Sequence, residues 1–304
     1  MLFFAFLRNV ESNEIKTRLT FSLFDAMMRK KTISLYGRNP MNILISGAAS
    51  GIGRAAVERF LSQGHTVYAL DISEIEQKDG VICYRADITN EQELCAVRDS
   101  LEREGVVLDA FILAAGIHKM ASLAEDETEL LRRVVEVNLI GTMLTCRILH
   151  ARLAPRGRIV ILTSEVASFD PLPFNGLYNV SKSALDTYAQ ALRQELNLIG
   201  QKVVTIRPGA VETPLASGSL TGTEALAERT VLYEKQSKHF LYFVKNFMGT
   251  PMKPERLAQK IYRVTVCRHP RPIYKVHHNL GLTLLSLLPK GMQCAVIKAL
   301  LNRK

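Results

Sequence analysis

Short aliphatic runs alternate with helical patterns over most of this chain, and this alternation constrains the fold more than any other feature. Each run has the length of a buried strand, and each helical pattern keeps its apolar residues on one stripe. The expected strands cover residues 43–46, 66–70, 81–84, 110–114, 158–162, 202–206 and 271–276, and the expected helices 53–63, 91–104, 127–152 and 177–199. Short connections between them require right-handed crossovers and parallel strands. The sequence therefore predicts an α/β fold with a doubly wound parallel sheet.

The alternation starts at Met41, and we expect one domain over residues 41–276. Two interpretations of residues 1–40 stay open: an appended amphipathic segment, or an extension upstream of a natural start at Met41. Residues 215–252 break the rhythm, being rich in Ser, Thr and Gly at first and then helical with several aromatics. Residues 277–304 form a basic tail with amphipathic helical spacing.

The positive charge of the chain is concentrated at one end. The formal net charge is +10, and residues 255–304 hold ten Lys or Arg beside Glu255 alone. Leucines between 282 and 288, next to Lys290 and Lys298, fit a helix lying on an anionic membrane surface. The alternative is that these leucines complete the core or a subunit interface. Because no recognition module accompanies the charge, we expect no nucleic-acid partner.

The cysteines and histidines give no metal or disulfide pattern. Five cysteines are scattered without CxxC spacing, so we expect reduced thiols in a cytoplasmic compartment and no metal. His277 and His278 would point in opposite directions in an extended segment and are expected to be exposed loop residues. The apolar run at 2–7 is far shorter than the ~20 residues of a membrane span, and we expect no span elsewhere. The protein would be at most peripheral on a membrane.

A glycine-rich loop, Ser46-Gly47-Ala48-Ala49-Ser50-Gly51-Ile52-Gly53, follows the first expected strand and opens a helix. Its glycines allow a tight turn and close approach to a pyrophosphate, which a helix N-terminus attracts. Asp71 ends the next strand, about twenty residues further on, where a carboxylate accepts bonds from an adenosine ribose. Because this carboxylate would repel a 2′-phosphate, NAD is favoured over NADP. Arg54 could still reach a phosphate, so the preference is not absolute.

A hydroxyl group and a Tyr/Lys pair follow the expected strand at 158–162. Ser164 lies at the carboxyl end of that strand. Tyr178 and Lys182 are four residues apart at the start of a helical pattern, so they share one helix face. A phenol has an unperturbed pKa near ~10 and needs a cation beside it to work near neutrality, which Lys182 supplies. The arrangement predicts a proton-transfer site.

Taken in order, the motifs of residues 41–214 resemble those of the short-chain dehydrogenase/reductase family. They are Gly47-x3-Gly51-Ile52-Gly53, Asp87-Ile88, Asn138 with Gly141, Ser164, Tyr178-x3-Lys182 and Pro208-Gly209-x3-Thr213-Pro214. Each is weak alone, but together they lie in register with the expected strands. The run Pro-Phe-Asn-Gly-Leu-Tyr and the basic tail resemble the hydroxysteroid and retinol dehydrogenase side of the family.

The resemblance implies a Rossmann-type domain, a nicotinamide cofactor and a role for each matching residue. Tyr178 would be the general acid/base, Lys182 would also bond the nicotinamide ribose, and Ser164 would hold the substrate oxygen. Asn138 would hold a water that links Lys182 to solvent. Asp87 and Ile88 would contact the adenine, and Val211 and Thr213 the nicotinamide carboxamide. By the same analogy, helices 127–152 and 177–199 would pair subunits in a homodimer or homotetramer.

Two features depart from the family pattern. The family's Asn-Asn-Ala-Gly segment reads Leu113-Ala114-Ala115-Gly116, which keeps the glycine that lets the cofactor pass but lacks the bracing amides. We still expect Ala114, Ala115 and Gly116 to line the cofactor. Tyr178 also follows Ser164 by 14 residues, one more than is usual, so strict counting would place Glu165 in the serine's position. A carboxylate there would repel a developing alkoxide, so we favour Ser164, with the extra residue absorbed at 167–173.

These features predict an oxidoreductase that transfers a hydride between NAD(H) and the carbinol or carbonyl carbon of a hydrophobic alcohol or ketone. The aromatics of residues 215–252 suggest a flap over an apolar substrate, although they could simply pack that flap onto the core. A non-catalytic sensor of dinucleotide redox state is the main alternative, and the complete set of Asn138, Ser164, Tyr178 and Lys182 argues against it. An epimerase or dehydratase is disfavoured by the short Ser–Tyr spacing.

Overall fold

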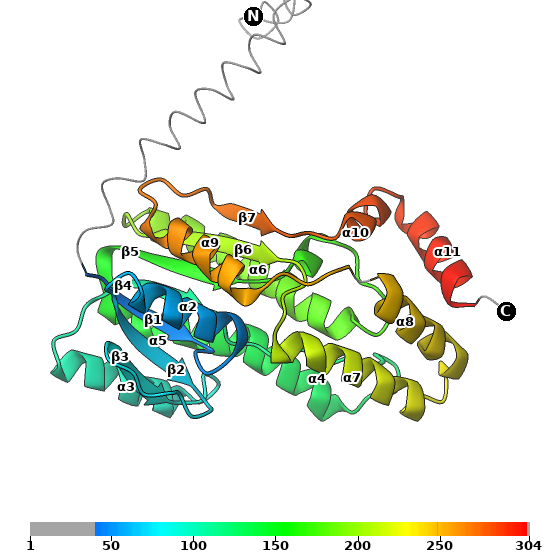
Figure 1. Cartoon of the computed structure of the whole chain (residues 1–304), viewed down its shortest axis with the longest axis horizontal. Helices are drawn as coiled ribbons and strands as arrows, with labels where there is room; N and C mark the ends of the chain where they lie inside the picture. Colours follow the sequence, from blue (N-terminus) through cyan, green and yellow to red (C-terminus); the bar gives the residue numbers. More distant parts are fainter. Residues whose placement is uncertain (1–39, 248, 303–304) are drawn as a thin grey trace, which may run out of the picture. The chain divides into compact units, whose positions relative to one another are not determined.

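Seven strands form one sheet in the order β3-β2-β1-β4-β5-β6-β7 in the computed structural model, which describes residues 40–247 and 249–302 (Figure 1). The strands are β1 Asn42–Ser46, β2 Thr66–Asp71, β3 Val81–Arg85, β4 Leu108–Leu113, β5 Leu153–Leu162, β6 Lys202–Pro208 and β7 Ile273–Val276. All neighbours pair in parallel, which confirms the doubly wound sheet. The strand order reverses between β1 and β4, where such sheets bind ligands. Apart from Pro40, the extension at 1–40 lies outside the described residues.

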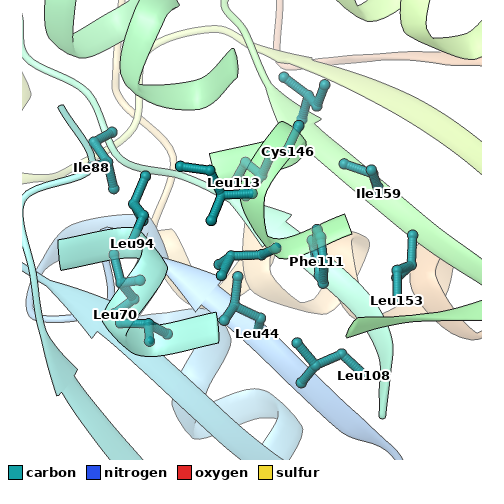
Figure 2. Close-up of a cluster of buried hydrophobic side chains, with 14 of the residues drawn as sticks. Leu44, Leu70, Ile88, Leu94, Leu108, Phe111, Leu113, Cys146, Leu153 and Ile159 are labelled. Carbon is teal, nitrogen blue, oxygen red and sulfur yellow. The ribbon is translucent and has the colours of Figure 1, made fainter. Parts of the chain in front are cut away.

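Helices cover both faces of the sheet because successive strand residues point to opposite sides. On one face, Leu44 and Phe111 pack with α3 (Glu91–Arg103), α5 (Thr142–Leu149) and α6 (Gly176–Asn197), and Figure 2 shows part of this cluster. On the other face, Ile43 and Ile45 pack with α2 (Gly51–Leu61) and α9 (Pro254–Val266). The two cores hold the carboxyl ends of the strands in fixed positions.

The chain from Thr128 to Arg152 is helical throughout, but its centre is not an α-helix. Helix α4 (Thr128–Val135) is joined to α5 by the π-helical segment η2 (Glu136–Gly141), and the 3₁₀ turn η3 (His150–Arg152) follows. The expectation of one regular helix was therefore wrong at η2, because apolar spacing does not reveal a widened turn. By length and composition this run could cross a membrane, contrary to our expectation, but half of its apolar window is buried inside the fold, as in a core helix.

Two helices, α7 (Pro214–Arg229) and α8 (Glu234–Phe247), occupy most of residues 215–252. The Ser/Thr/Gly-rich start is helical as well, because Thr213 caps α7: its Oγ1 accepts from Ala216 N at 3.2 Å, and Pro214 suits the first turn. Helices α7 and α8 pack together, and the tail helix α11 (Lys290–Leu301) packs on α8. The other tail helix is α10 (Leu280–Leu285). Arg303 and Lys304 of the tail lie outside the described residues.

The adjacent histidines after β7 bond to backbone carbonyls. His277 Nε2 pairs with Thr250 O and His278 Nε2 with Arg207 O, each at 2.9 Å. His277 is exposed, whereas His278 is half buried against β6, which differs from the expected pair of exposed residues. Within residues 40–247 and 249–302, no three His, Cys, Asp or Glu side chains are grouped to hold a metal ion.

Candidate active site

A cavity of about 640 Å³ lies at the carboxyl ends of the strands on both sides of the switch point. Its lining includes all the predicted site residues but Asn138, namely Gly47, Ser50, Gly51, Ile52, Gly53, Asp71, Asp87, Ile88, Ala114, Ala115, Gly116, Ser164, Tyr178, Lys182, Val211 and Thr213. The fold therefore brings the expected cofactor and proton-transfer residues into one cavity. Its size lies within the ~300–1,000 Å³ of small-molecule and cofactor sites.

The glycine loop leaves room only for hydrogen at two positions. Gly47 has φ of +71°, and a Cβ there would lie 2.7 Å from the backbone nitrogen of Ala115. A Cβ on Gly53 would lie 1.9 Å from Gly47 O. Both obstacles are backbone atoms that cannot rotate away. The loop thus forms a narrow cradle at the N-terminus of α2, which fits a pyrophosphate.

Asp71 stands at the end of β2 with its carboxylate turned to the glycine loop. Oδ2 accepts from Ala49 N at 3.0 Å, and Oδ1 accepts from Ser73 N at 2.9 Å. Each carboxylate oxygen can accept a further bond, and the side chain lines the cavity. The placement fits an acceptor for ribose hydroxyls at a fixed distance from the cradle.

Tyr178 projects from the first turn of α6 into the cavity, where the Ser164 hydroxyl lies beside its phenol. Burial raises the pKa of Tyr178 to about 12, and the Ser164 hydroxyl opposes that rise. Burial is therefore the largest cause of the shift in this pKa. At neutral pH the phenol is protonated.

Lys182 lies one helical turn beyond Tyr178 and is only 5% exposed. Its Nζ donates to Leu162 O at 3.3 Å and lies 5.8 Å from the centre of the Tyr178 ring. Burial lowers the pKa of Lys182 to about 8. The ammonium group is therefore still charged at pH 7, next to the phenol.

Glu165, the competing residue for the serine's position, also lines the cavity, but its carboxylate is bonded to the C-terminal tail. It opens the short 3₁₀ turn η4 (Glu165–Ser168), and its Oε2 accepts from Asn279 N at 2.6 Å. Burial raises the pKa of this carboxyl group, and the Asn279 bond opposes the rise. Ser164, by contrast, interacts with the Tyr178 phenol and lowers its pKa against the effect of burial. The geometry places the Ser164 hydroxyl, and not the Glu165 carboxylate, beside the Tyr178 phenol.

Asn138 lies in η2 behind the cavity and is fully buried. Its Oδ1 accepts from Ile117 N at 2.7 Å, while Nδ2 donates to Ile117 O and Ser181 Oγ, both at 2.9 Å. Asn138 thereby braces the loop after β4, which lacks amide side chains of its own. A Cβ on Gly116 would come within 3.1 Å of Asn138 Oδ1 and 3.3 Å of Lys182 Nζ, so both side chains lie next to this glycine.

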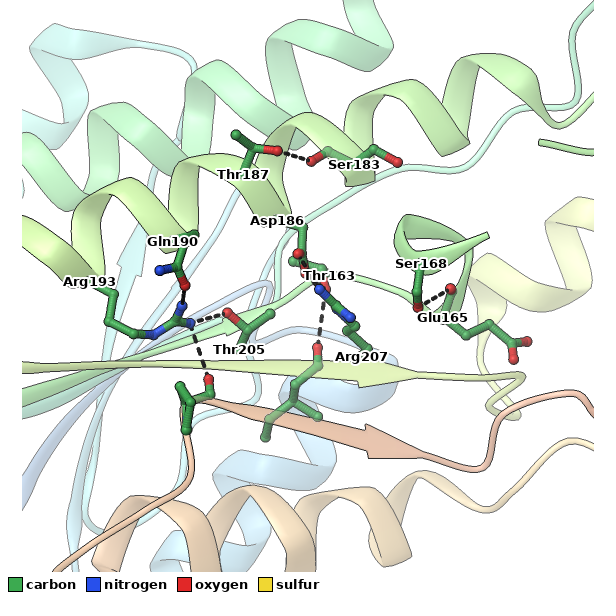
Figure 3. Close-up of polar contacts among 12 residues, drawn as sticks. Thr163, Glu165, Ser168, Ser183, Asp186, Thr187, Gln190, Arg193, Thr205 and Arg207 are labelled. Carbon is green, nitrogen blue, oxygen red and sulfur yellow. Dashed lines mark hydrogen bonds and ion pairs between the residues drawn. The ribbon is translucent and has the colours of Figure 1, made fainter. Parts of the chain in front are cut away.

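A polar network that the sequence analysis did not identify fixes α6 to the sheet (Figure 3). Asp186, one turn after Lys182, pairs with Arg207 of β6 at 2.5 Å and accepts from Thr163 Oγ1 at 3.2 Å. Arg193 donates to Thr205 Oγ1 at 2.7 Å. Because these partners lie on β6 and directly after β5, they hold the helix that carries Tyr178 and Lys182 against the sheet.

His118 is a second residue that sequence reasoning missed. It lines the cavity two residues beyond Gly116, and its ring meets the Tyr178 ring edge-on with centroids 4.4 Å apart. A polar residue just past a strand end was the available signal. Its contacts span distant parts of the chain, so no local pattern marked it.

Comparison with known proteins places the chain in a family. A family model described as short chain dehydrogenase matches residues 41–223. The 3-ketodihydrosphingosine reductase of Bacteroides thetaiotaomicron is 26% identical over 236 residues, covering 76% of this chain and 86% of that protein. A short chain dehydrogenase from Burkholderia cenocepacia, solved in complex with NADP, covers 87% of this chain and 99% of its own with a TM-score of 0.66 and 18% identity.

The chain spans about a third of the length of another curated relative. The probable oxidoreductase EphD of Mycobacterium tuberculosis is 30% identical over 187 residues, which are 58% of this chain and 32% of that protein. The matched family segment contains the glycine loop, Ser164, Tyr178 and Lys182. This chain belongs to the short-chain dehydrogenase/reductase family.

Proposed function

We propose that this protein is an NAD(H)-dependent oxidoreductase that interconverts a hydrophobic alcohol and its ketone. The observation that carries the proposal is that Ser164, Tyr178 and Lys182 share one cavity with the glycine cradle and Asp71. The bound nicotinamide supplies or accepts the hydride. The residues of the chain hold the cofactor, orient the substrate oxygen and move one proton.

The cofactor would extend along the lining of the cavity. Gly47 and Gly53 with the start of α2 would hold the pyrophosphate, and Asp71 the adenosine ribose. Asp87 and Ile88 would contact the adenine, Val211 and Thr213 the carboxamide, and Lys182 the nicotinamide ribose. Ala114, Ala115 and Gly116 would let the cofactor pass close to the backbone.

In carbonyl reduction, Tyr178 donates its phenolic proton to the substrate oxygen while Ser164 donates a hydrogen bond to the same atom. With a pKa of about 12 the phenol holds its proton at pH 7. With a pKa of about 8 Lys182 is still cationic there, and its charge stabilises the phenolate that proton transfer leaves behind. These ionisation states favour the reductive direction.

A hydrophobic substrate is supported by one apolar wall of the cavity. Val166, Leu215, Leu220 and Val244 line it, and two of them come from α7. An apolar body can displace water from such a wall at little polar cost. The name of one relative, 3-ketodihydrosphingosine reductase, supports the same substrate class.

Turnover assays with lipid-like ketones test this proposal directly. Steroid, retinoid and long-chain ketones would be offered with NADH or NADPH, and oxidation of the reduced nicotinamide followed by absorbance. We expect turnover with NADH at lower cofactor concentration than with NADPH. Asp71→Ser should reduce the preference for NADH over NADPH by about tenfold, because the charge that repels the 2′-phosphate is removed. Tight NADH binding without turnover of any ketone would instead support the redox sensor.

We also propose that the C-terminal tail rests on an anionic membrane surface. Leu280 and Leu284 share one face of α10, Leu287 lies in the turn that follows it, and the three are 71%, 58% and 75% exposed. On α11, apolar residues at every fourth position from Met292 are exposed as well. The basic composition of residues 255–304 complements acidic lipid.

Vesicle flotation measures this contact. The full chain should float with phosphatidylglycerol vesicles and less in high salt, and the Leu284→Glu/Leu287→Glu variant should bind at least about tenfold more weakly, since two apolar side chains are lost from the membrane. Leu198→Glu, at a leucine 85% exposed after α6, is the control and should float as the parent does. Undiminished flotation of the double variant would show that the tail is not the contact.

A further inference from the structure

His118 connects the catalytic tyrosine to two other elements. Its ring packs edge-on against Tyr178, with centroids 4.4 Å apart and planes at 73°. Its Nε2 pairs with Oδ1 of Asn175, the N-cap residue of α6, at 2.7 Å. Its Nδ1 pairs with the hydroxyl of Ser219 on α7. One imidazole thus contacts the phenol, the start of the helix that carries it, and the flap.

The ionisation of His118 defines the direction of these bonds. Burial lowers its pKa, and the neighbouring Lys182 charge lowers it further against the effect of the Asn175 bond. A neutral imidazole has one N–H. Since Asn175 Oδ1 can only accept, Nε2 carries the proton and donates a hydrogen bond to that oxygen. Nδ1 therefore accepts from the Ser219 hydroxyl.

Ser219 has a second acceptor on its own helix. Its Oγ lies 3.1 Å from Leu215 O, so the hydroxyl keeps a partner whether or not it meets His118. Nδ1 of His118 depends on Ser219 for its bond among the described residues. Loss of this bond would leave His118 Nδ1 without a partner among the described residues, whereas Ser219 would keep its bond to Leu215 O. The bond also joins α7 to the ring that touches Tyr178.

Helix α7 also forms part of the substrate wall. Leu215, Ala216, Ser219 and Leu220 line the cavity at successive turns of α7. A residue that fixes the first turns of α7 also fixes this wall. The same residue packs on the phenol that donates the proton.

We propose that His118 is a positioning residue that fastens helix α7 over the substrate and holds the Tyr178 phenol in line with it. The inference rests on the proposed function. In this proposal the hydrogen bond of His118 and its aromatic ring have separate effects. The hydrogen bond to Ser219 sets how firmly the substrate wall is held, and the ring edge sets where the phenol points.

Three variants separate these two effects. Ser219→Ala removes only the bond, His118→Phe removes both hydrogen bonds but keeps a ring beside Tyr178, and His118→Ala removes the ring as well. Ser217→Ala is the matched control: it lies on α7, its hydroxyl bonds Thr213 O at 3.3 Å, and it is outside the cavity lining. NADH affinity is measured for each variant to verify that the cofactor half is intact.

We expect Ser219→Ala and His118→Phe, which both lose the hydrogen bond between His118 and α7, to raise KM by about threefold to tenfold, with kcat within about twofold of the parent. His118→Ala should in addition lower kcat by about tenfold to a hundredfold, because a misplaced catalytic group costs that much. Ser217→Ala should match the parent in both constants. If Ser219→Ala, His118→Phe and His118→Ala all lowered kcat and left KM unchanged, the hydrogen bond and the ring would not have separate effects.

Hydrogen exchange of the α7 amides provides a measurement that does not need turnover. Exchange should be faster in Ser219→Ala and His118→Phe and unchanged in Ser217→Ala. If the parent, Ser219→Ala, His118→Phe and Ser217→Ala exchanged at the same rate, His118 would not fasten α7. The same conclusion would follow if the four chains had equal KM and kcat. A parent chain without turnover would instead refute the proposed oxidoreductase, and the exchange rates would still decide whether His118 holds α7.

Discussion

Tyr178→Phe is expected to lower kcat for ketone reduction by about a hundredfold to ten-thousandfold, the usual contribution of a general acid. The variant lacks the hydroxyl that lies beside Ser164 and that, in the proposed mechanism, would donate the proton to the substrate oxygen. The ring remains, so its contact with His118 and the fold of α6 are preserved. Steady-state turnover at saturating NADH measures the loss, and NADH titration should show unchanged affinity.

The matched control for this variant is Tyr188→Phe. Tyr188 lies on the same helix but packs against the core cluster away from the cavity, so removing its hydroxyl should leave kcat unchanged.

The ionisation of Lys182 predicts how the rate of ketone reduction depends on pH. Below pH 8 the lysine is charged and reduction should be independent of pH, and the rate should fall as the pH rises through about 8, where Lys182 loses its proton. Full activity of Tyr178→Phe would exclude it as the acid.

Gly53→Ala is expected to weaken NADH binding by about tenfold to a hundredfold. Its Cβ would lie 1.9 Å from Gly47 O, so the loop has to move away from the start of α2. Overpacking of this kind costs about 1–3 kcal/mol, and 1.4 kcal/mol corresponds to tenfold in affinity. Fluorescence titration with NADH measures the affinity, and thermal unfolding of the cofactor-free chain separates lost stability from a distorted cradle.

Gly218→Ala is the control for the same chemical change. Gly218 lies in α7, and a Cβ there meets no atom within 4 Å among the described residues. NADH affinity should be unchanged, and the helix slightly more stable, because alanine favours helix over glycine by about 1 kcal/mol. If Gly53→Ala bound NADH like the parent, the cofactor would not pass over this loop.

The sheet and most of the cavity could be predicted because their signals are local. A buried strand, a glycine loop and a Tyr/Lys pair four residues apart each occupy a few consecutive positions, and parallel topology then brings the strand ends together. The family resemblance then assigned a role to each of these motifs, because they occur in the family's order and at the ends of the expected strands.

Other features depend on contacts between distant segments and could not be predicted. His118 meets partners 57 and 101 residues away, and Arg207 meets Asp186 across 21. The choice between Ser164 and Glu165 depended on which way one turn faces. The rise in the Tyr178 pKa came from burial, which spacing does not report. The widened turn at η2 leaves the apolar pattern nearly unchanged.

The bond between Glu165 and Asn279 ties the C-terminal tail to the turn that carries Ser164. Asn279 also caps α10 through Leu282 N at 3.0 Å. Displacing α10 would leave a buried carboxyl group without its donor, at about 1–3 kcal/mol. A ligand of the tail that displaces α10 would therefore also change the affinity for a ligand beside Ser164, and the reverse effect would be equal. Such a ligand would act as an effector of the turn that carries Ser164.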